Sequence, residues 1–435
     1  MSTHIFHEGK APMEKSVQTS PELSPIQSRS ELVWGRIRKF NRKLESSFRR
    51  KKFSRMAKSP FEFFRSTGHL YWEDLGQHGL LEAFGDGKDT RLWIHGHLDC
   101  GQFIRAADAT GRLVVDLGSF DQAVVADYQH DLWRLGVSLT LACRENLRSP
   151  SVTDKMVEIC ARSYWREIKR CRWYPHLRYA PWDEEQASGS LRHWLAQARK
   201  QESADLLKNW TESSKSGPRF KAHPDFETLA PSEVKKWEKA LEHYAENLKP
   251  WPMEKPRVFK VLDMVQRRNG EGEGKPIFAL VKVKEDNGFR ILDIQKPVEP
   301  VSLDFLPKKA RKKTEELIQG DPVWRVILAS RVLGCHTDLW MGRLTFQGDD
   351  FIVREQPAYG GVLPHAQLNE DAAFQLGAIL ARAHCRAKES FAKKAFQLIR
   401  EDKKAFRLQV SALSHAYADQ VELDYQSFLK MKKEK

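Results

Sequence analysis

The stretch LWIHGHLDCGQF, from Leu92 to Phe103, places His95, His97 and Asp99 at alternate positions. Such H-x-H-x-D spacing is typical of loops that present several ligands to zinc. Strand alternation sends the two histidines to one face, while the aspartate can already lie in a turn. The stretch also fits a phosphotransfer loop or an ordinary strand end, so the surrounding sequence has to separate these interpretations.

The flanking sequence predicts an α+β chain. TRLWIHG and GRLVVDLGSFD both have strand character, and the turn-like IRAADATG between them predicts that these two runs pair antiparallel. Apolar residues at helical spacing follow in HDLWRLGVSLTLACREN. Further on, VFKVLDMVQRRNGEGEGKPIFALVKVKE predicts a strand, a glycine-rich turn and a second strand, and the chain closes with amphipathic helices.

The length of 435 residues predicts more than one domain or lobe. The composition shifts divide the chain into five segments. We expect a disordered tail (1–30), a helical segment with a strand pair (31–180), a helical insert or linker (181–256), a β-rich region (257–357) and C-terminal helices (358–435).

The formal net charge of +14 favours anionic partners. Between Arg36 and Lys58, eleven lysines and arginines stand against one acid, Glu45, which predicts contact with an anionic surface or nucleic acid or, alternatively, a solvated helix face. No apolar run reaches the roughly 18 residues of a membrane span, and the first residues lack a signal-peptide core. The six scattered cysteines form no C-x-x-C pair. We therefore expect a cytoplasmic protein with reduced thiols.

The segment NGEGEGK, from Asn269 to Lys275, is a candidate phosphate loop. Its glycines would let backbone N–H groups approach phosphate oxygens; they are Gly270, Gly272 and Gly274. The spacing is not that of a Walker motif, and the two glutamates between the glycines would repel phosphate. A flexible hairpin tip therefore remains the alternative.

Lysines and carboxylates elsewhere could complete a kinase-type site. Lys282 and Lys284 lie on one face of the strand after the glycine-rich turn, where a kinase-type site has a phosphate-binding lysine. Asp116 and Asp121 lie in and after the second strand run, and Gln102 could supply an amide oxygen. These three oxygen donors are the candidate ligands for Mg²⁺.

Several motifs together resemble one known family. KKFSRMAKSPFEFFRSTGHLYWEDL, HDLWRLGVSL, RRNGEGEGK, VREQPAYGG and LGAILARAHCRA are similar to motifs of the bacterial domain-of-unknown-function family number 2252. That family resembles the protein-kinase-like and aminoglycoside-phosphotransferase-like folds with the parts in rotated order. The resemblance implies a circularly permuted, bilobal fold, with a large helical lobe, a smaller β-rich nucleotide-type lobe, and ATP and Mg²⁺ as possible cofactors.

The resemblance also assigns roles to the opening stretch. The family's G-D-x-H-x-x-N-F falls on Gly96 to Phe103, so the catalytic aspartate position holds His97, the family histidine is Asp99, and the metal-binding asparagine is Gln102. The next motif, F-D-x-N-D-F-D-E, puts Ser119 where a Mg²⁺-binding aspartate is expected. Serine removes a charge that Mg²⁺ prefers, so the site departs from the family where its chemistry would lie.

Two cofactor-binding residues also follow from the resemblance. Lys284 best matches the family lysine, and Arg354 is the arginine of the VREQP motif. The departures favour a degenerate, pseudokinase-type binder of a nucleotide or small phosphorylated ligand. One alternative is an active ATP-dependent phosphotransferase with an altered His97/Asp99 centre. Another is a metallohydrolase that uses His95, His97 and Asp99.

Overall fold

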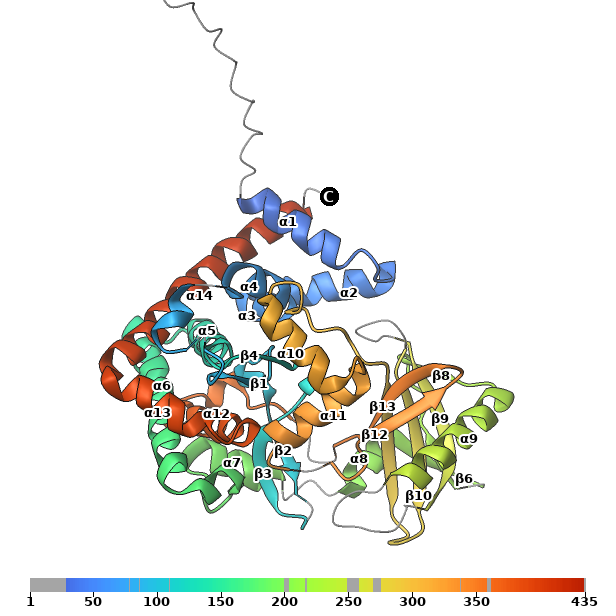
Figure 1. Cartoon of the computed structure of the whole chain (residues 1–435). Helices are drawn as coiled ribbons and strands as arrows, with labels where there is room; N and C mark the ends of the chain where they lie inside the picture. Colours follow the sequence, from blue (N-terminus) through green and yellow to red (C-terminus); the bar gives the residue numbers. More distant parts are fainter. Residues whose placement is uncertain are drawn as a thin grey trace, which may run out of the picture.

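The computed structural model describes residues 29–77, 79–85, 87–108, 110–198, 203–215, 217–248, 258–268, 275–336, 338–357 and 361–433. Runs of helices and runs of strands follow one another along the chain in an α+β arrangement, as the sequence predicts. A large helical lobe lies beside a smaller lobe built on one antiparallel sheet (Figure 1). None of the helices described is long and apolar enough to cross a lipid bilayer.

The described part of the chain starts with four helices at the top of the helical lobe (Figure 1). These are α1 (Arg29–Phe40), α2 (Ser46–Met56), α3 (Pro60–Ser66) and α4 (Gly68–Leu75). The side chain of Ser59 accepts a hydrogen bond from the backbone of Glu62, which caps α3. In α1, Val33, Trp34 and Ile37 are buried, so most of the basic side chains are left at the surface.

Helices from both halves of the sequence build the core of this lobe. They are α5 (Gln129–Glu145), α6 (Pro150–Trp173), α12 (Glu370–Ala387), α13 (Phe391–Glu401) and α14 (Lys403–Lys433). The helices α12 and α6 pack closely, and α14 runs along α5 and α1 (Figure 1). Gly377 makes the first contact possible, because a Cβ there would lie 2.3 Å from the carbonyl oxygen of Cys160.

Short strands inside the helical lobe carry the opening stretch. Strand β1 (Arg91–Ile94) pairs with β4 (Val124–Asp127), and β2 (Phe103–Ala107) pairs with β3 (Leu113–Leu117), which β5 (Trp182–Asp183) extends. The predicted pairing of the run around β1 with β3 was therefore wrong. The Asp108 carboxylate accepts from the Thr110 and Arg112 backbones, so a tight turn is sufficient and the preceding residues pair as β2.

The smaller lobe is a six-stranded antiparallel sheet in the order β12-β13-β11-β10-β9-β8. Its strands are β8 (Phe226–Thr228), β9 (Phe259–Arg267), β10 (Ile277–Val283), β11 (Phe289–Gln295), β12 (Gly342–Phe346) and β13 (Asp349–Glu355). Between β11 and β12 run α10 (Lys308–Ile318), which contacts β4 of the helical lobe, and α11 (Pro322–Leu333), which contacts both lobes. Figure 1 shows these two helices in the middle of the molecule.

The segment 181–256, expected as a helical insert, contains strands as well as helices. Besides β8 it holds α7 (Gly189–Ala198), α8 (Ser203–Trp210), β6 (Thr211–Ser214), β7 (Gly217–Phe220) and α9 (Pro231–Asn247). Trp237, Leu241 and Tyr244 of α9 are buried in the core on one face of the sheet. The segment therefore helps to build the smaller lobe.

Candidate functional site

The loop between β1 and β2 is fixed by the buried carboxylate of Asp131 in α5. Its two oxygens accept hydrogen bonds from the backbone nitrogens of His95 (2.6 Å) and Gly96 (3.0 Å). Nε2 of His384 in α12 lies 3.3 Å from one of these oxygens. Gly96 has a positive φ of 75°, and a Cβ there would lie 2.3 Å from the Gln122 carbonyl oxygen. Only glycine fits this turn.

His95 points into the protein interior. Its Nε2 lies 2.8 Å from the Gly118 carbonyl oxygen, and its Nδ1 accepts from the backbone of His97 at 3.3 Å. These partners assign the ring proton to Nε2. Burial lowers the pKa of His95, so the ring is a neutral structural link between β1 and the end of β3.

His97 is directed at the N-terminal helices. Its Nε2 lies 2.8 Å from the Arg65 carbonyl oxygen, while Nδ1 has no partner among the described residues. A Cβ on Gly68 would come 2.7 Å from this Nδ1, so the ring lies tightly against the start of α4. Burial lowers the pKa of His97 well below its ordinary value.

Asp99 is completely buried and has partners on both oxygens. One oxygen accepts from the Gly101 backbone at 2.7 Å, and the other lies 3.2 Å from Nε of Arg65. His95, His97 and Asp99 therefore turn to three different partners. In the part of the chain that the structure describes, no group of three or more His, Cys, Asp or Glu side chains is arranged to hold a metal ion.

Asp116 binds the start of the segment between α11 and β12. One of its oxygens accepts from the backbone and Nδ1 of His336 at 2.9 and 2.7 Å, and from the Cys335 backbone at 2.5 Å. The other oxygen lies 3.6 Å from Arg386. Burial alone would raise the pKa of Asp116, but His336 and Arg386 lower it below the ordinary value. The same pairing outweighs burial and raises the pKa of His336.

Asp121 meets the smaller lobe through an arginine between two carboxylates. Arg354 of β13 lies 3.2 Å from Asp121 and 3.4 Å from Asp293 of β11. Attraction to Asp121 is the largest cause of the raised pKa of Arg354. Burial raises the pKa of Asp293, whereas Arg354 outweighs burial at Asp121 and lowers its pKa. We call the region of Asp116, His336, Asp121, Arg354 and Asp293 the seam.

The other predicted metal-site positions add no side-chain bond at the seam. The backbone carbonyl of Gln102 accepts from Gly118 at 3.0 Å, but no described residue bonds to its side-chain amide. Ser119 has a left-handed backbone with φ of 61° and is exposed. Asp338 interacts electrostatically with both His336 and Arg354, which places the Asp116 pair and the Asp121 pair in one region. Among the described residues no group of three or more His, Cys, Asp or Glu side chains there is arranged to hold a metal ion.

The predicted phosphate-binding residues are only partly described. Gly270, Gly272 and Gly274 lie outside the described residues. Lys282 is exposed on β10, with its Nζ 6.0 Å from the ring centroid of Phe289, and Lys284 is exposed just after β10. Among the described cofactor-binding candidates, Arg354 is therefore the one at the seam.

Arg325 of α11 is a residue that the sequence reading missed. It is 1% exposed and donates to the carbonyl oxygens of Asp121 (2.7 Å), Ala123 (3.1 Å) and Val298 (2.6 Å). Burial lowers its pKa to about 10. The only signal in the sequence was an arginine inside the apolar helix PVWRVILASRVL.

Comparison with known families gives one match, over residues 45–431, to the family described as an uncharacterized protein conserved in bacteria, domain of unknown function 2252. The chain belongs to this family. The match covers most of the chain, including both lobes and the seam. Curated proteins and solved structures give no match.

Proposed function

We propose that this protein has a circularly permuted, kinase-like fold and acts as a pseudokinase-type binder. Its ligand would be a nucleotide or another small phosphorylated compound, held without transfer of a phosphoryl group. The observation that carries the proposal is the internal pairing of the three carboxylates predicted for the site. Asp99 pairs with Arg65, Asp116 lies 3.6 Å from Arg386, and Asp121 pairs with Arg354.

The topology of the smaller lobe supports the kinase-like part. In protein kinases a glycine-rich loop covers the phosphates, a lysine lies on the third strand, and a helix glutamate pairs with it. Here β9, β10 and β11 are neighbours in the sheet, and the glycine-rich segment separates β9 from β10 in the sequence. Helices α10 and α11 then follow β11.

The charges in this lobe differ from those that phosphoryl transfer needs. Strand β11 (FRILDIQ) contains no lysine, and its Asp293 faces Arg354. Lys296, just beyond β11, pairs with Asp349 at 2.7 Å. Helix α11 contains no acid and carries the buried Arg325 instead. A lysine–glutamate pair of the kinase type therefore has no counterpart on these two elements.

The donor set also fits Mg²⁺ poorly. Mg²⁺ takes oxygen ligands in near-octahedral geometry and is usually held by one or two free carboxylates. Asp116 is occupied by His336 and Asp121 by Arg354, so an ion would have to displace both ion pairs. His97 is a poor general base because its buried ring resists protonation and its Nε2 already contacts a carbonyl.

The test is a titration of the purified protein with ATP, with and without Mg²⁺, followed by thermal unfolding and ATP turnover. A ligand at about 100 times its Kd should stabilise the fold by roughly 2.7 kcal/mol. We expect stabilisation that does not depend on Mg²⁺, without turnover. His97→Ala should bind ATP as the wild type does, and exposed His176→Ala serves as the matched control.

Three other results would contradict the proposal. If the wild type and His176→Ala hydrolyse ATP and His97→Ala does not, the protein is an active phosphotransferase. Stoichiometric zinc by elemental analysis, without any effect of nucleotide, would indicate the metallohydrolase. If neither ATP nor other phosphorylated compounds change the unfolding temperature, the binding function itself is wrong.

A further inference from the structure

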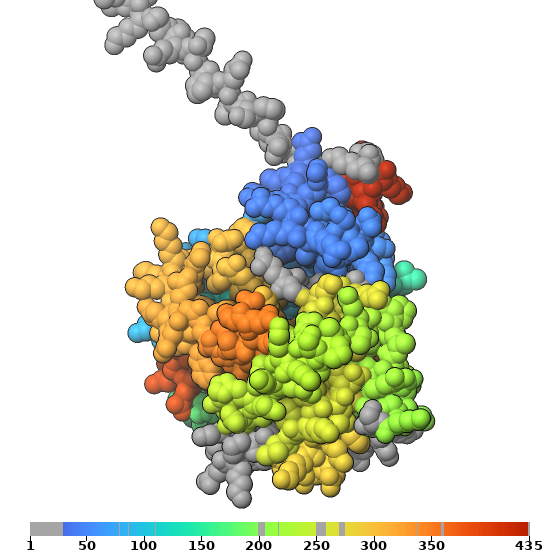
Figure 2. Space-filling model, turned by 90° about the vertical axis from the view of Figure 1, so that its right-hand side faces the viewer, coloured from blue at the N-terminus to red at the C-terminus, as the bar shows by residue number. Residues whose placement is uncertain are grey.

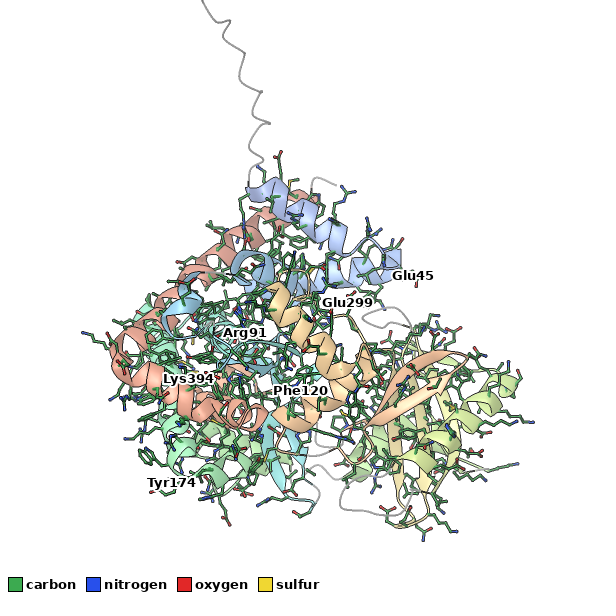
Figure 3. The ribbon with its side chains drawn as sticks, in the orientation of Figure 1. Glu45, Arg91, Phe120, Tyr174, Glu299 and Lys394 are labelled. Atoms are coloured by element: carbon green, nitrogen blue, oxygen red, sulfur yellow. The ribbon has the colours of Figure 1, made fainter. Side chains whose placement is uncertain are left out.

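A pocket of about 900 Å³ lies between the N-terminal helices and the smaller lobe. Its walls come from α1, α2, α4, the loop 297–305, and Arg268 and Lys275 at the ends of β9 and β10. In Figure 2 the N-terminal helices (blue) lie above the yellow and orange smaller lobe. Figure 3 labels Glu45 and Glu299, two of the residues that line the pocket. None of the seam residues lines it.

Positive charge exceeds negative charge around this pocket. Six cations line it: Arg36, Lys39, Arg42, Lys43, Arg268 and Lys275. Four acids line it: Glu45, Glu73, Glu299 and Asp304. Two of these acids already have partners, because Glu73 lies 2.6 Å from Arg36 and Asp304 lies 3.9 Å from Arg311.

Three of the cations remain without an acidic partner among the described residues. They are Lys39, Arg42 and Arg268, which come from two distant parts of the chain and are all exposed. Lysine and arginine side chains that converge on one cavity attract anions, and arginine can hold a phosphate with two parallel hydrogen bonds. The free positive charge therefore points to a phosphate or similar anion.

His69 supplies an independent sign of a missing partner. Its side chain lines the pocket and is 5% exposed, yet neither ring nitrogen has a hydrogen-bond partner among the described residues. The His69 ring is stacked on the Phe40 ring, with 4.2 Å between the ring centroids, and this contact fixes its position. Buried polar atoms are nearly always hydrogen-bonded, so these two nitrogens need a polar partner that the described residues do not supply.

The pocket also has an apolar wall. Phe40, Leu44, Phe48 and Leu303 line it together with the cations. Small-ligand sites typically combine such a wall with a few polar groups that fix orientation. A bare inorganic ion would leave the wall unused, whereas an organic phosphate would use both parts.

We propose that this pocket binds a small organic phosphate. The phosphate contacts Lys39, Arg42 and Arg268 and accepts a hydrogen bond from the ring of His69, and the organic part lies against the apolar wall. The pocket shares no residue with the seam. The inference deepens the proposed function, because it assigns a site to a small phosphorylated compound, and it rests on that proposal for the class of ligand.

The experiment uses the full chain and titrates it with phenyl phosphate by calorimetry, with phenol and inorganic phosphate as the two partial ligands. We expect saturable binding of phenyl phosphate that is tighter than binding of either part. Lys39→Glu should weaken it at least about tenfold, because a charged hydrogen bond to phosphate is lost.

Arg38→Glu is the matched control, since Arg38 is the exposed neighbour of Lys39 on α1 but does not line the pocket. It changes the net charge equally and should alter affinity by no more than about twofold, because screening weakens distant charges. If Lys39→Glu and Arg38→Glu weaken the binding of phenyl phosphate equally, the overall charge of the protein explains the effect. That result would overturn the proposal.

His69→Phe provides a second readout. It removes the two ring nitrogens and keeps an aromatic ring against Phe40, so the unliganded protein should unfold at the same temperature or higher. Phenyl phosphate should bind this variant more weakly. Unchanged affinity would overturn the role of His69.

Two further results would overturn the proposal as a whole. One is absence of saturable phenyl phosphate binding to the wild type. The other is binding only to vesicles of phosphatidylcholine and phosphatidylserine, which would assign the basic surface to membranes. Either result leaves the ATP titration and turnover assay as a separate test of the proposed function.

Discussion

The seam and the N-terminal pocket both gather positive charge next to the smaller lobe, but they use it differently. At the seam Arg354 lies between Asp121 and Asp293, and the nearby Arg325 donates to three carbonyl oxygens. At the pocket Lys39 and Arg42 contact no acid that the structure describes. Paired charges hold elements together, whereas unpaired charges facing a cavity remain available for a ligand.

The largest expected effect tests the structural side of this comparison. Arg325→Met should destabilise the protein by about 3 kcal/mol or more, because three carbonyl groups that are buried or partly buried lose their donor. Chemical denaturation measures the change. Exposed Arg331→Met on the same helix should change stability by less than about 0.5 kcal/mol. Similar small effects of both substitutions would show that the seam does not depend on its buried arginine.

The pH dependence of the seam gives the second prediction. The raised pKa of His336 contributes stability that is complete below the ordinary value of 6.5 and is lost as pH rises through the raised pKa. The lowered pKa of Asp116 contributes stability above about 3.8, which is lost as pH falls through the lowered pKa. The pair should therefore stabilise the protein most at pH values between these two ordinary pKa values.

Urea denaturation of the wild type and His336→Gln at a series of pH values measures this contribution. Above pH 6.5 the wild type should lose stability relative to His336→Gln, since glutamine cannot titrate. His176→Gln is the control, because His176 is exposed in the short helix Pro175–Tyr179. Parallel pH profiles of the wild type and His336→Gln would mean that the ion pair adds nothing to the seam.

The sequence predicted local structure better than it predicted partners. The α+β class and the strand run that became β3 followed from periodicity, which reports on neighbouring residues. The partners at the seam could not be read this way, because Asp116 and His336 are 220 positions apart and Arg325 and Asp121 are 204 apart. Local pattern also failed for β1, whose true partner β4 lies beyond the hairpin of β2 and β3.

The same limit explains the candidate site. Asp116 and Asp121 were predicted as metal ligands because they lie in and after a strand run. Their partners His336 and Arg354 are distant in the sequence, so a local pattern could not reveal them. The basic segment and the glycine-rich segment were separate candidates in the sequence. Lys39 of the first and Lys275 at the end of the second line one pocket, which only the fold could bring together.

The smallest expected effect tests the ligand side of the comparison. Lys39→Gln should change the stability of the unliganded protein by less than about 0.5 kcal/mol, because an exposed lysine without an acidic partner contributes little. Urea denaturation in a buffer without phosphate, sulfate or other multivalent anions measures the change. A loss of about 2 kcal/mol would show that Lys39 holds the N-terminal helices in place. In that case the positive charge of the pocket, like that of the seam, would stabilise the fold and would not serve to bind a ligand.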